Sequence, residues 1–208
     1  MSQYSIQVTN NSGKAQNIAI YQTYPDLETG LPLVWFSKNV NFENSNKFEW
    51  ETPWALNWGT TEKPIAPGVM FISSGPLRAM EPNSKDGNNA MKINYSEDDF
   101  KSSEAFRNGK IPKGSMEVKT DTSFSVDDAS NMCISVYMNG KATFAMQGEP
   151  NGAFRFDTHP TYWICTTRVK EGTAVSGNFV SSPTKVIFDN GNTDLSFELT
   201  DTLEFIQA

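Results

Sequence analysis

The strongest constraint on the fold is a pair of apolar segments joined by Asn139-Gly140. Residues 132–138 read Met-Cys-Ile-Ser-Val-Tyr-Met, and residues 141–147 read Lys-Ala-Thr-Phe-Ala-Met-Gln. Asn-Gly is the preferred pair for the two-residue type I′ turn that joins two antiparallel strands. We therefore predict a β-hairpin, and the turn fixes its register. The pairs expected on one face are Tyr137 with Ala142, Ser135 with Phe144 and Cys133 with Met146.

Both faces of this hairpin carry apolar side chains. On the second face, the same register places Val136 opposite Thr143 and Ile134 opposite Ala145. A strand pair that is apolar on both faces must be covered on both sides. The hairpin is therefore expected at the centre of a layered β fold.

The rest of the chain consists mainly of short alternating segments bounded by Asn, Gly, Ser and Pro, which is typical of β-strands and turns. Only residues 96–108 favour a helix, because Ser96 can cap it, three acidic residues follow and Gly109 can end it. We predict one all-β domain over residues 1–208 with at least ten strands and at most one short helix. The expected architecture is an antiparallel β-sandwich, with a distorted barrel as the alternative. The other strands are expected at residues 4–9, 17–23, 33–38, 47–51, 54–58, 69–73, 90–95, 114–120, 175–180, 184–188 and 194–203.

Three of the five tryptophans lie between residues 48 and 59. Trp50, Trp54 and Trp58 share one parity, so an extended chain would project them from one face. Pro53 disfavours a single central strand through this segment, and we predict two strands that meet at Thr52-Pro53. A core position is favoured over a ligand surface, most clearly for Trp50. Trp54 or Trp58 is the better candidate for the edge of a pocket.

Charge and hydropathy exclude two classes of partner. The formal charge is -7 with a pI near 4.8, and no basic run exceeds two residues, so we expect no nucleic-acid partner. No window approaches the length of apolar chain that spans a membrane. The first residues lack the basic and apolar regions of a signal peptide, which favours a cytoplasmic protein, with export by another route as the alternative.

His159 is the only histidine, and it follows Asp157 by two residues. A general base or a metal ligand at this position would use His159 with Asp157. The alternative, which we favour, is a structural histidine, because one histidine cannot assemble a multi-histidine metal site. No Gly-x-Ser-x-Gly elbow and no glycine-rich phosphate loop is present. We therefore assign no catalytic residue and no cofactor.

The two cysteines, Cys133 and Cys165, have no short metal-ligand spacing. Both fall in apolar segments, so they are expected as buried reduced thiols. Whether they are neighbours in space depends on strand order, which the spacing leaves open.

A recognisable pattern is carried by eight segments, residues 10–12, 21–26, 33–38, 54–59, 66–68, 138–147, 149–151 and 158–164. Together these segments resemble the RhiA-type rhizosphere-expressed proteins. The resemblance implies a bacterial protein whose expression responds to the environment or to a quorum signal, and it implies no catalytic residue.

Many aromatic residues and neutral polar loops, without a catalytic set, favour a non-enzymatic protein that binds a small ligand, a glycan or a partner surface. One alternative is an enzyme or metal-binding protein centred on His159. Another is a structural protein that self-associates through a free sheet edge, so a homo-oligomer is an open expectation. The candidate ligand contacts are Trp54, Trp58, His159, Tyr162 and Trp163.

Overall fold

The computed structural model describes residues 3–189 and 191–208, and these residues form strands and no helix. Eighteen strands make four sheets, and none of the described sheets closes on itself. The all-β prediction is confirmed, with four sheets in place of the two of a simple sandwich. The described residues include no helix long and apolar enough to cross a membrane.

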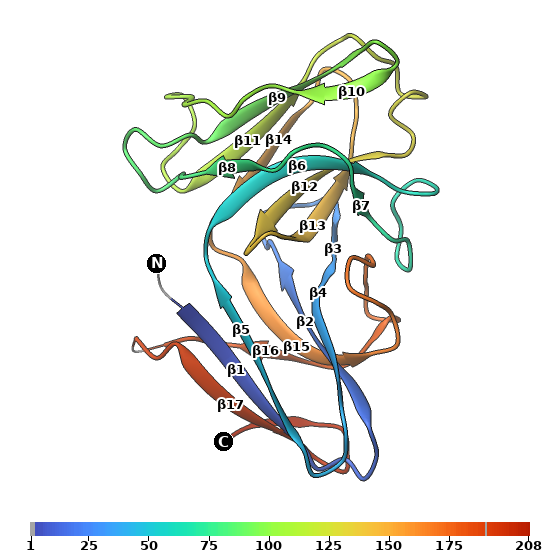
Figure 1. Ribbon diagram of the computed structural model, residues 1–208, viewed down its shortest axis with the longest axis vertical. Coiled ribbons are helices and arrows are strands. Elements are labelled where there is room, and N and C mark those ends of the chain that lie inside the picture. Colours follow the sequence, from blue (N-terminus) through green and yellow to red (C-terminus); the bar gives the residue numbers. More distant parts are fainter. Residues whose placement is uncertain (1–2, 190) are drawn as a thin grey trace.

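Two sheets form the lower half of the molecule (Figure 1). The terminal sheet contains, in spatial order, β18 (Phe205–Gln207), β17 (Asp194–Leu199), β1 (Gln3–Asn10) and β5 (Ser45–Glu51). The β2 sheet contains β16 (Val180–Val186), β15 (Thr161–Thr167), β2 (Gln16–Thr23) and β4 (Val34–Val40). Strands β1 and β17 pair in parallel, whereas the other pairs in these two sheets are antiparallel.

Two further sheets form the upper half (Figure 1). The hairpin sheet contains β3 (Leu31–Pro32), β13 (Lys141–Gln147), β12 (Met132–Met138), β6 (Trp54–Thr60) and β7 (Ile72–Ser73), and β8 (Arg78–Met80) also pairs with β6. The β9 sheet contains β10 (Asp99–Ser102), β9 (Ala90–Ser96), β11 (Ser115–Thr120) and β14 (Ala153–Asp157). Strand β12 is buried along its whole length, as the apolar pattern of the hairpin predicts.

One cluster of buried apolar side chains runs through all four sheets. It includes Ile6 of the terminal sheet, Ile20 of the β2 sheet, Ile134 of the hairpin sheet and Met116 of the β9 sheet. A hydrogen bond also joins the halves, because the Trp35 indole nitrogen donates to the carbonyl oxygen of Met138 at 3.1 Å. The sheets are thus layers around a shared core.

The hairpin turn has the predicted geometry, but part of the predicted register is wrong. Asn139 and Gly140 have φ values of 52° and 73°, and both central residues of a type I′ turn require positive φ. Tyr137 lies opposite Ala142 as expected. Beyond Tyr137 the register shifts by one residue, and the observed pairs are Val136 with Phe144, Ser135 with Ala145, Ile134 with Met146 and Cys133 with Gln147.

The extra residue in this β-bulge is Thr143. Its side chain is fully buried, and its hydroxyl donates to the carbonyl oxygen of Val136 at 3.3 Å. The Tyr24 hydroxyl lies 3.3 Å from the Thr143 hydroxyl. Side chains from another part of the chain therefore favour the bulge, which the hairpin sequence does not reveal.

The predicted helix at residues 96–108 is wrong. Glu97 and Asp98 have φ values of 53° and 59° and form a tight turn between β9 and β10. Phe100 then lies opposite Tyr95, and its ring contacts Phe124 at a centroid distance of 5.0 Å. The acidic residues that resemble a helix start are turn residues, and packing of Phe100 stabilises the strand that follows.

Most other predicted strands are present, but the strand predicted at residues 69–73 is reduced to β7 (Ile72–Ser73), and one strand, β16 (Val180–Val186), replaces those predicted at 175–180 and 184–188. The break at Thr52-Pro53 is confirmed, because β5 ends at Glu51 and β6 begins at Trp54. Residues 175–179 form a connection before β16, and β17 ends at Leu199. Strands β3, β8, β14, β15 and β18 are additional to the predicted set, as is β10, which lies within the predicted helix.

Candidate functional site

The three tryptophans of residues 48–59 are all buried, with exposed fractions of 2% for Trp50, 8% for Trp54 and 5% for Trp58. Trp50 lies in an aromatic cluster between the terminal and β2 sheets, where its ring centroid is 5.2 Å from Trp35 and 5.7 Å from Tyr162. The core prediction therefore holds for this segment. Trp54 begins β6, the strand that continues the chain from the lower into the upper half (Figure 1).

A pocket of about 470 Å³ lies where the two halves meet, and we call it the waist pocket. Trp54, His159 and Tyr162 line it together, although the chain separates Trp54 from the other two by more than a hundred residues. The complete lining is Tyr4, Thr52, Trp54, Asn83, Met138, Thr158, His159, Pro160, Thr161, Tyr162, Lys185, Val186, Ile187 and Phe188.

The waist pocket combines aromatic rings with neutral polar groups. Asn83 and Thr161 offer an amide and a hydroxyl, and the buried Thr158 hydroxyl has no hydrogen-bond partner among residues 3–189 and 191–208. Among the described residues, His159 and Lys185 are the only lining side chains that can be cationic, and none that lines the pocket carries a carboxylate. Its chemistry therefore suits a neutral or anionic molecule more than a cation.

Tyr162 presents a neutral hydroxyl at the inner end of the waist pocket. Burial raises the pKa of Tyr162 far above its ordinary value. The hydroxyl lies 3.6 Å from the sulfur of Met138, a weak acceptor. It can therefore donate to a better acceptor from a bound molecule.

His159 and Asp157 are not hydrogen-bonded to each other in the described part of the chain. The Asp157 carboxylate accepts a hydrogen bond from the Ser115 hydroxyl, and none of the described hydrogen bonds joins it to His159. Both side chains also line a smaller cavity of about 120 Å³ beside Arg155. Within the described residues, no group of three His, Cys, Asp or Glu side chains is arranged to hold a metal ion.

The model of the RhiA family, described simply as RhiA, matches residues 1–207. The chain belongs to the RhiA family. A search of curated proteins and a search of solved structures each returned no match. The family assignment confirms the resemblance seen in the sequence and brings no catalytic residue with it.

Two of the five predicted contacts of this RhiA-family protein lie away from the waist pocket. Trp58 packs against Phe100 in the upper half at a centroid distance of 5.6 Å. Trp163 stacks on Tyr21 at 6.2 Å, and its indole nitrogen donates to the Thr23 hydroxyl at 2.9 Å. Neighbouring residues of a strand point to opposite faces, so Trp163 cannot share the face of Tyr162.

The structure also adds aromatic residues to the site that the sequence did not identify. Tyr4 and Phe188 line the waist pocket, and their rings contact each other with centroids 5.0 Å apart. Tyr4 shares a face with Ile6 in the first strand, which is a visible signal for an inward position. Phe188 shares the parity of the buried Val186 in the strand predicted at residues 184–188, although β16 ends at Val186.

Proposed function

We propose that this RhiA-family protein is a non-enzymatic binding protein and that the waist pocket takes one small molecule. The proposal rests on one observation: Trp54, His159 and Tyr162, chosen from the sequence as candidate contacts, line the same pocket. The volume of about 470 Å³ lies within the range of about 300–1,000 Å³ that small-molecule sites occupy.

The lining favours a ring-shaped ligand with hydroxyl or carbonyl groups, such as a sugar unit or a small aromatic compound. Aromatic side chains offer flat apolar surfaces to such a ring. Asn83, Thr158 and Thr161 can exchange hydrogen bonds with its polar substituents, and Tyr162 can donate to an oxygen. Because none of the described lining residues carries a carboxylate, a cationic ligand would lack a counter-charge.

A fluorescence titration tests the proposal, because Trp54 lines the pocket. Purified protein is titrated with a panel of mono- and disaccharides and simple phenols, and binding is read from tryptophan emission. We expect saturable changes for at least one compound. His159→Gln and Lys185→Gln should each weaken binding several-fold without lowering the melting temperature, since both side chains are exposed.

The matched control is Lys170→Gln, which makes the same charge change as Lys185→Gln at an exposed position outside the waist pocket. Its affinity should equal that of the parent. No saturable response to any compound, or equal weakening in all three variants, would contradict a ligand site at the waist pocket.

A further inference from the structure

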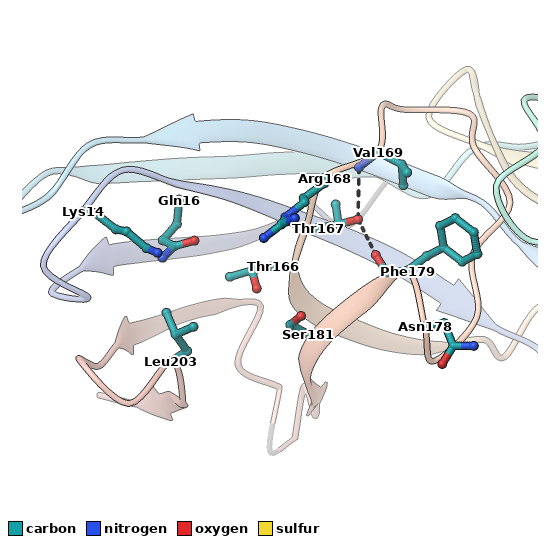
Figure 2. A pocket seen from close by; sticks show the side chains of 10 residues that line it. All are labelled: Lys14, Gln16, Thr166, Thr167, Arg168, Val169, Asn178, Phe179, Ser181 and Leu203. Carbon is teal, nitrogen blue, oxygen red and sulfur yellow. Dashed lines mark hydrogen bonds between the residues drawn. The ribbon is translucent and has the colours of Figure 1, made fainter.

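A second pocket of about 470 Å³ lies at the end of the β2 sheet, and we call it the end pocket (Figure 2). It is built from three places in the chain: the start of β2, the paired ends of β15 and β16, and the turn between β17 and β18. The residues on which its chemistry depends are Lys14, Gln16, Thr166, Arg168, Ser181 and Leu203. None of them lines the waist pocket.

One face of the β2 sheet packs against the shared core, and its side chains change from apolar to polar where the sheet reaches the end pocket. Ile20 lies opposite Ile164, and both belong to the shared core. Two residues further along each strand, Ile18 lies opposite Thr166, which in turn lies opposite Ser181. Paired residues project from the same face of a sheet. The apolar layer therefore ends at Thr166 and Ser181, and Gln16 extends the polar end along β2.

Two cationic side chains lie beside these polar residues, and neither has an acidic partner in the described part of the chain. Lys14 and Arg168 line the end pocket, and neither forms an ion pair within the described ranges 3–189 and 191–208. Of the residues that the structure describes, no Asp or Glu lines the pocket. In a chain with a formal charge of -7, this local excess of positive charge attracts an anion.

Several hydrogen-bond donors in the end pocket are unused. The Gln16 side-chain nitrogen is buried and has no hydrogen-bond partner in the part of the chain that is described. The Thr166 and Ser181 hydroxyls likewise take part in none of the described hydrogen bonds, whereas the neighbouring Thr167 hydroxyl donates to the Phe179 carbonyl at 2.6 Å (Figure 2). A buried donor without an acceptor costs free energy, and a bound oxygen atom would remove that cost.

Unusual backbone conformations occur on both sides of the same pocket. Ser182 has a φ of 53° in a β-bulge, where Ser182 and Pro183 together oppose Cys165. Leu203 has a φ of 63°, which is rare for a bulky side chain. Such conformations persist only where the surrounding structure holds them, and they gather at binding sites. Here they hold Ser181 and Leu203 at the pocket wall.

We propose that the end pocket binds a small organic oxyanion, a carboxylate or a phosphate ester with a short apolar body. The anionic oxygens are held by Arg168 and Lys14, with hydrogen bonds from Gln16 and Thr166. The apolar body lies against Leu203, an apolar side chain of the lining that packs against the shared core.

An NMR titration tests this proposal in the full-length protein. Acetate, hexanoate and inorganic phosphate are added separately at constant ionic strength, with chloride as the reference anion. We expect saturable shifts of the amide signals of Gln16, Thr166 and Arg168, with hexanoate binding more tightly than acetate because its chain covers Leu203. A response to phosphate alone would identify a phosphate ester, and a response to the carboxylates alone would identify a carboxylate.

Two variants and a control separate a built site from general charge attraction. Arg168→Gln and Gln16→Leu should each weaken binding roughly tenfold, the effect of losing one hydrogen bond to a charged group. Lys85→Gln makes the same charge change as Arg168→Gln at an exposed position outside the pocket, and its affinity should equal that of the parent. The proposal is overturned if no anion gives saturable shifts, or if Arg168→Gln and Lys85→Gln weaken binding equally. If hexanoate binds no better than acetate, the apolar part of the assignment is wrong.

Discussion

Trp50 is the residue at the centre of the aromatic packing between the terminal sheet and the β2 sheet. It is 2% exposed, and its ring lies within 6.2 Å, centroid to centroid, of Tyr4, Trp35, Phe36, Tyr162 and Phe188. Trp50→Ala should therefore lower the free energy of unfolding by about 3–5 kcal/mol, since it leaves a large cavity among rings. Urea denaturation measures this change.

The control for this variant is Trp163→Ala. Trp163 is only partly buried on the opposite face of the β2 sheet, so its removal should cost clearly less. Equal losses of unfolding free energy in the two variants would mean that the aromatic cluster contributes no more to stability than the partly buried Trp163.

The two cysteines are expected to make the free energy of unfolding fall at alkaline pH. Cys133 and Cys165 are buried free thiols on different sheets, and burial raises their pKa values from 9.0 to about 11 and about 12. A folded pKa above the unfolded value gives stability that is fully present below pH 9 and is lost as the pH rises toward the folded pKa. We expect the urea midpoint to fall between about pH 9 and pH 11.

Replacing both cysteines with alanine tests the origin of this fall. The double variant should lose less stability over the same alkaline range, although Tyr21 and Tyr137, whose pKa values burial raises to about 12, still contribute. If the pH dependence has the same slope in the double variant and the parent, the thiols are not its source.

At the scale of elements, Gly59 shows how closely β6 and β7 approach. A side chain at Gly59 would meet the Ile72 carbonyl oxygen and lie 2.5 Å from the Phe71 ring. Gly59→Ala should therefore cost at least about 1–3 kcal/mol through overpacking. Chemical denaturation measures this loss, and Gly177→Ala is the control. The methyl group added at Gly177 meets nothing within 4 Å, so little change in stability is expected. A Gly59 variant as stable as the Gly177 variant would show that the two strands can move apart freely.

At the scale of the whole molecule, we propose that the four sheets unfold as one unit. The shared core continues from Ile6 in the terminal sheet to Met116 in the β9 sheet. Layers that share a core are expected to melt cooperatively, so the calorimetric and van't Hoff enthalpies should agree in differential scanning calorimetry. Two resolved transitions, one for each half in Figure 1, would show instead two independently stable parts.

Local chemistry made the main features of the fold predictable. Alternation marks strands, Asn139-Gly140 forms the expected turn, and Pro53 ends one strand before Trp54 begins the next. The same rule of alternation separates Trp163 from Tyr162. These features follow from backbone geometry within a few residues, so no knowledge of distant contacts is needed.

Only part of the candidate site could be predicted from the sequence. Trp54, His159 and Tyr162 were identifiable as residue types, but their meeting at the waist pocket depends on how β6 and β15 are placed in space. The sequence did not predict the end pocket. Lys14, Thr166 and Ser181 are common residue types in strands and turns, and only strand pairing brings them together.

The sequence by itself thus determined an all-β chain of the RhiA family, its strong turn and the buried character of the three tryptophans at residues 48–59. Only the tertiary structure decided the bulge at Thr143, the strand that replaces the predicted helix at residues 96–108, and the composition of both pockets. The physical reason is that alternation fixes which face a side chain occupies. What lies opposite that face depends on packing between segments far apart in the chain.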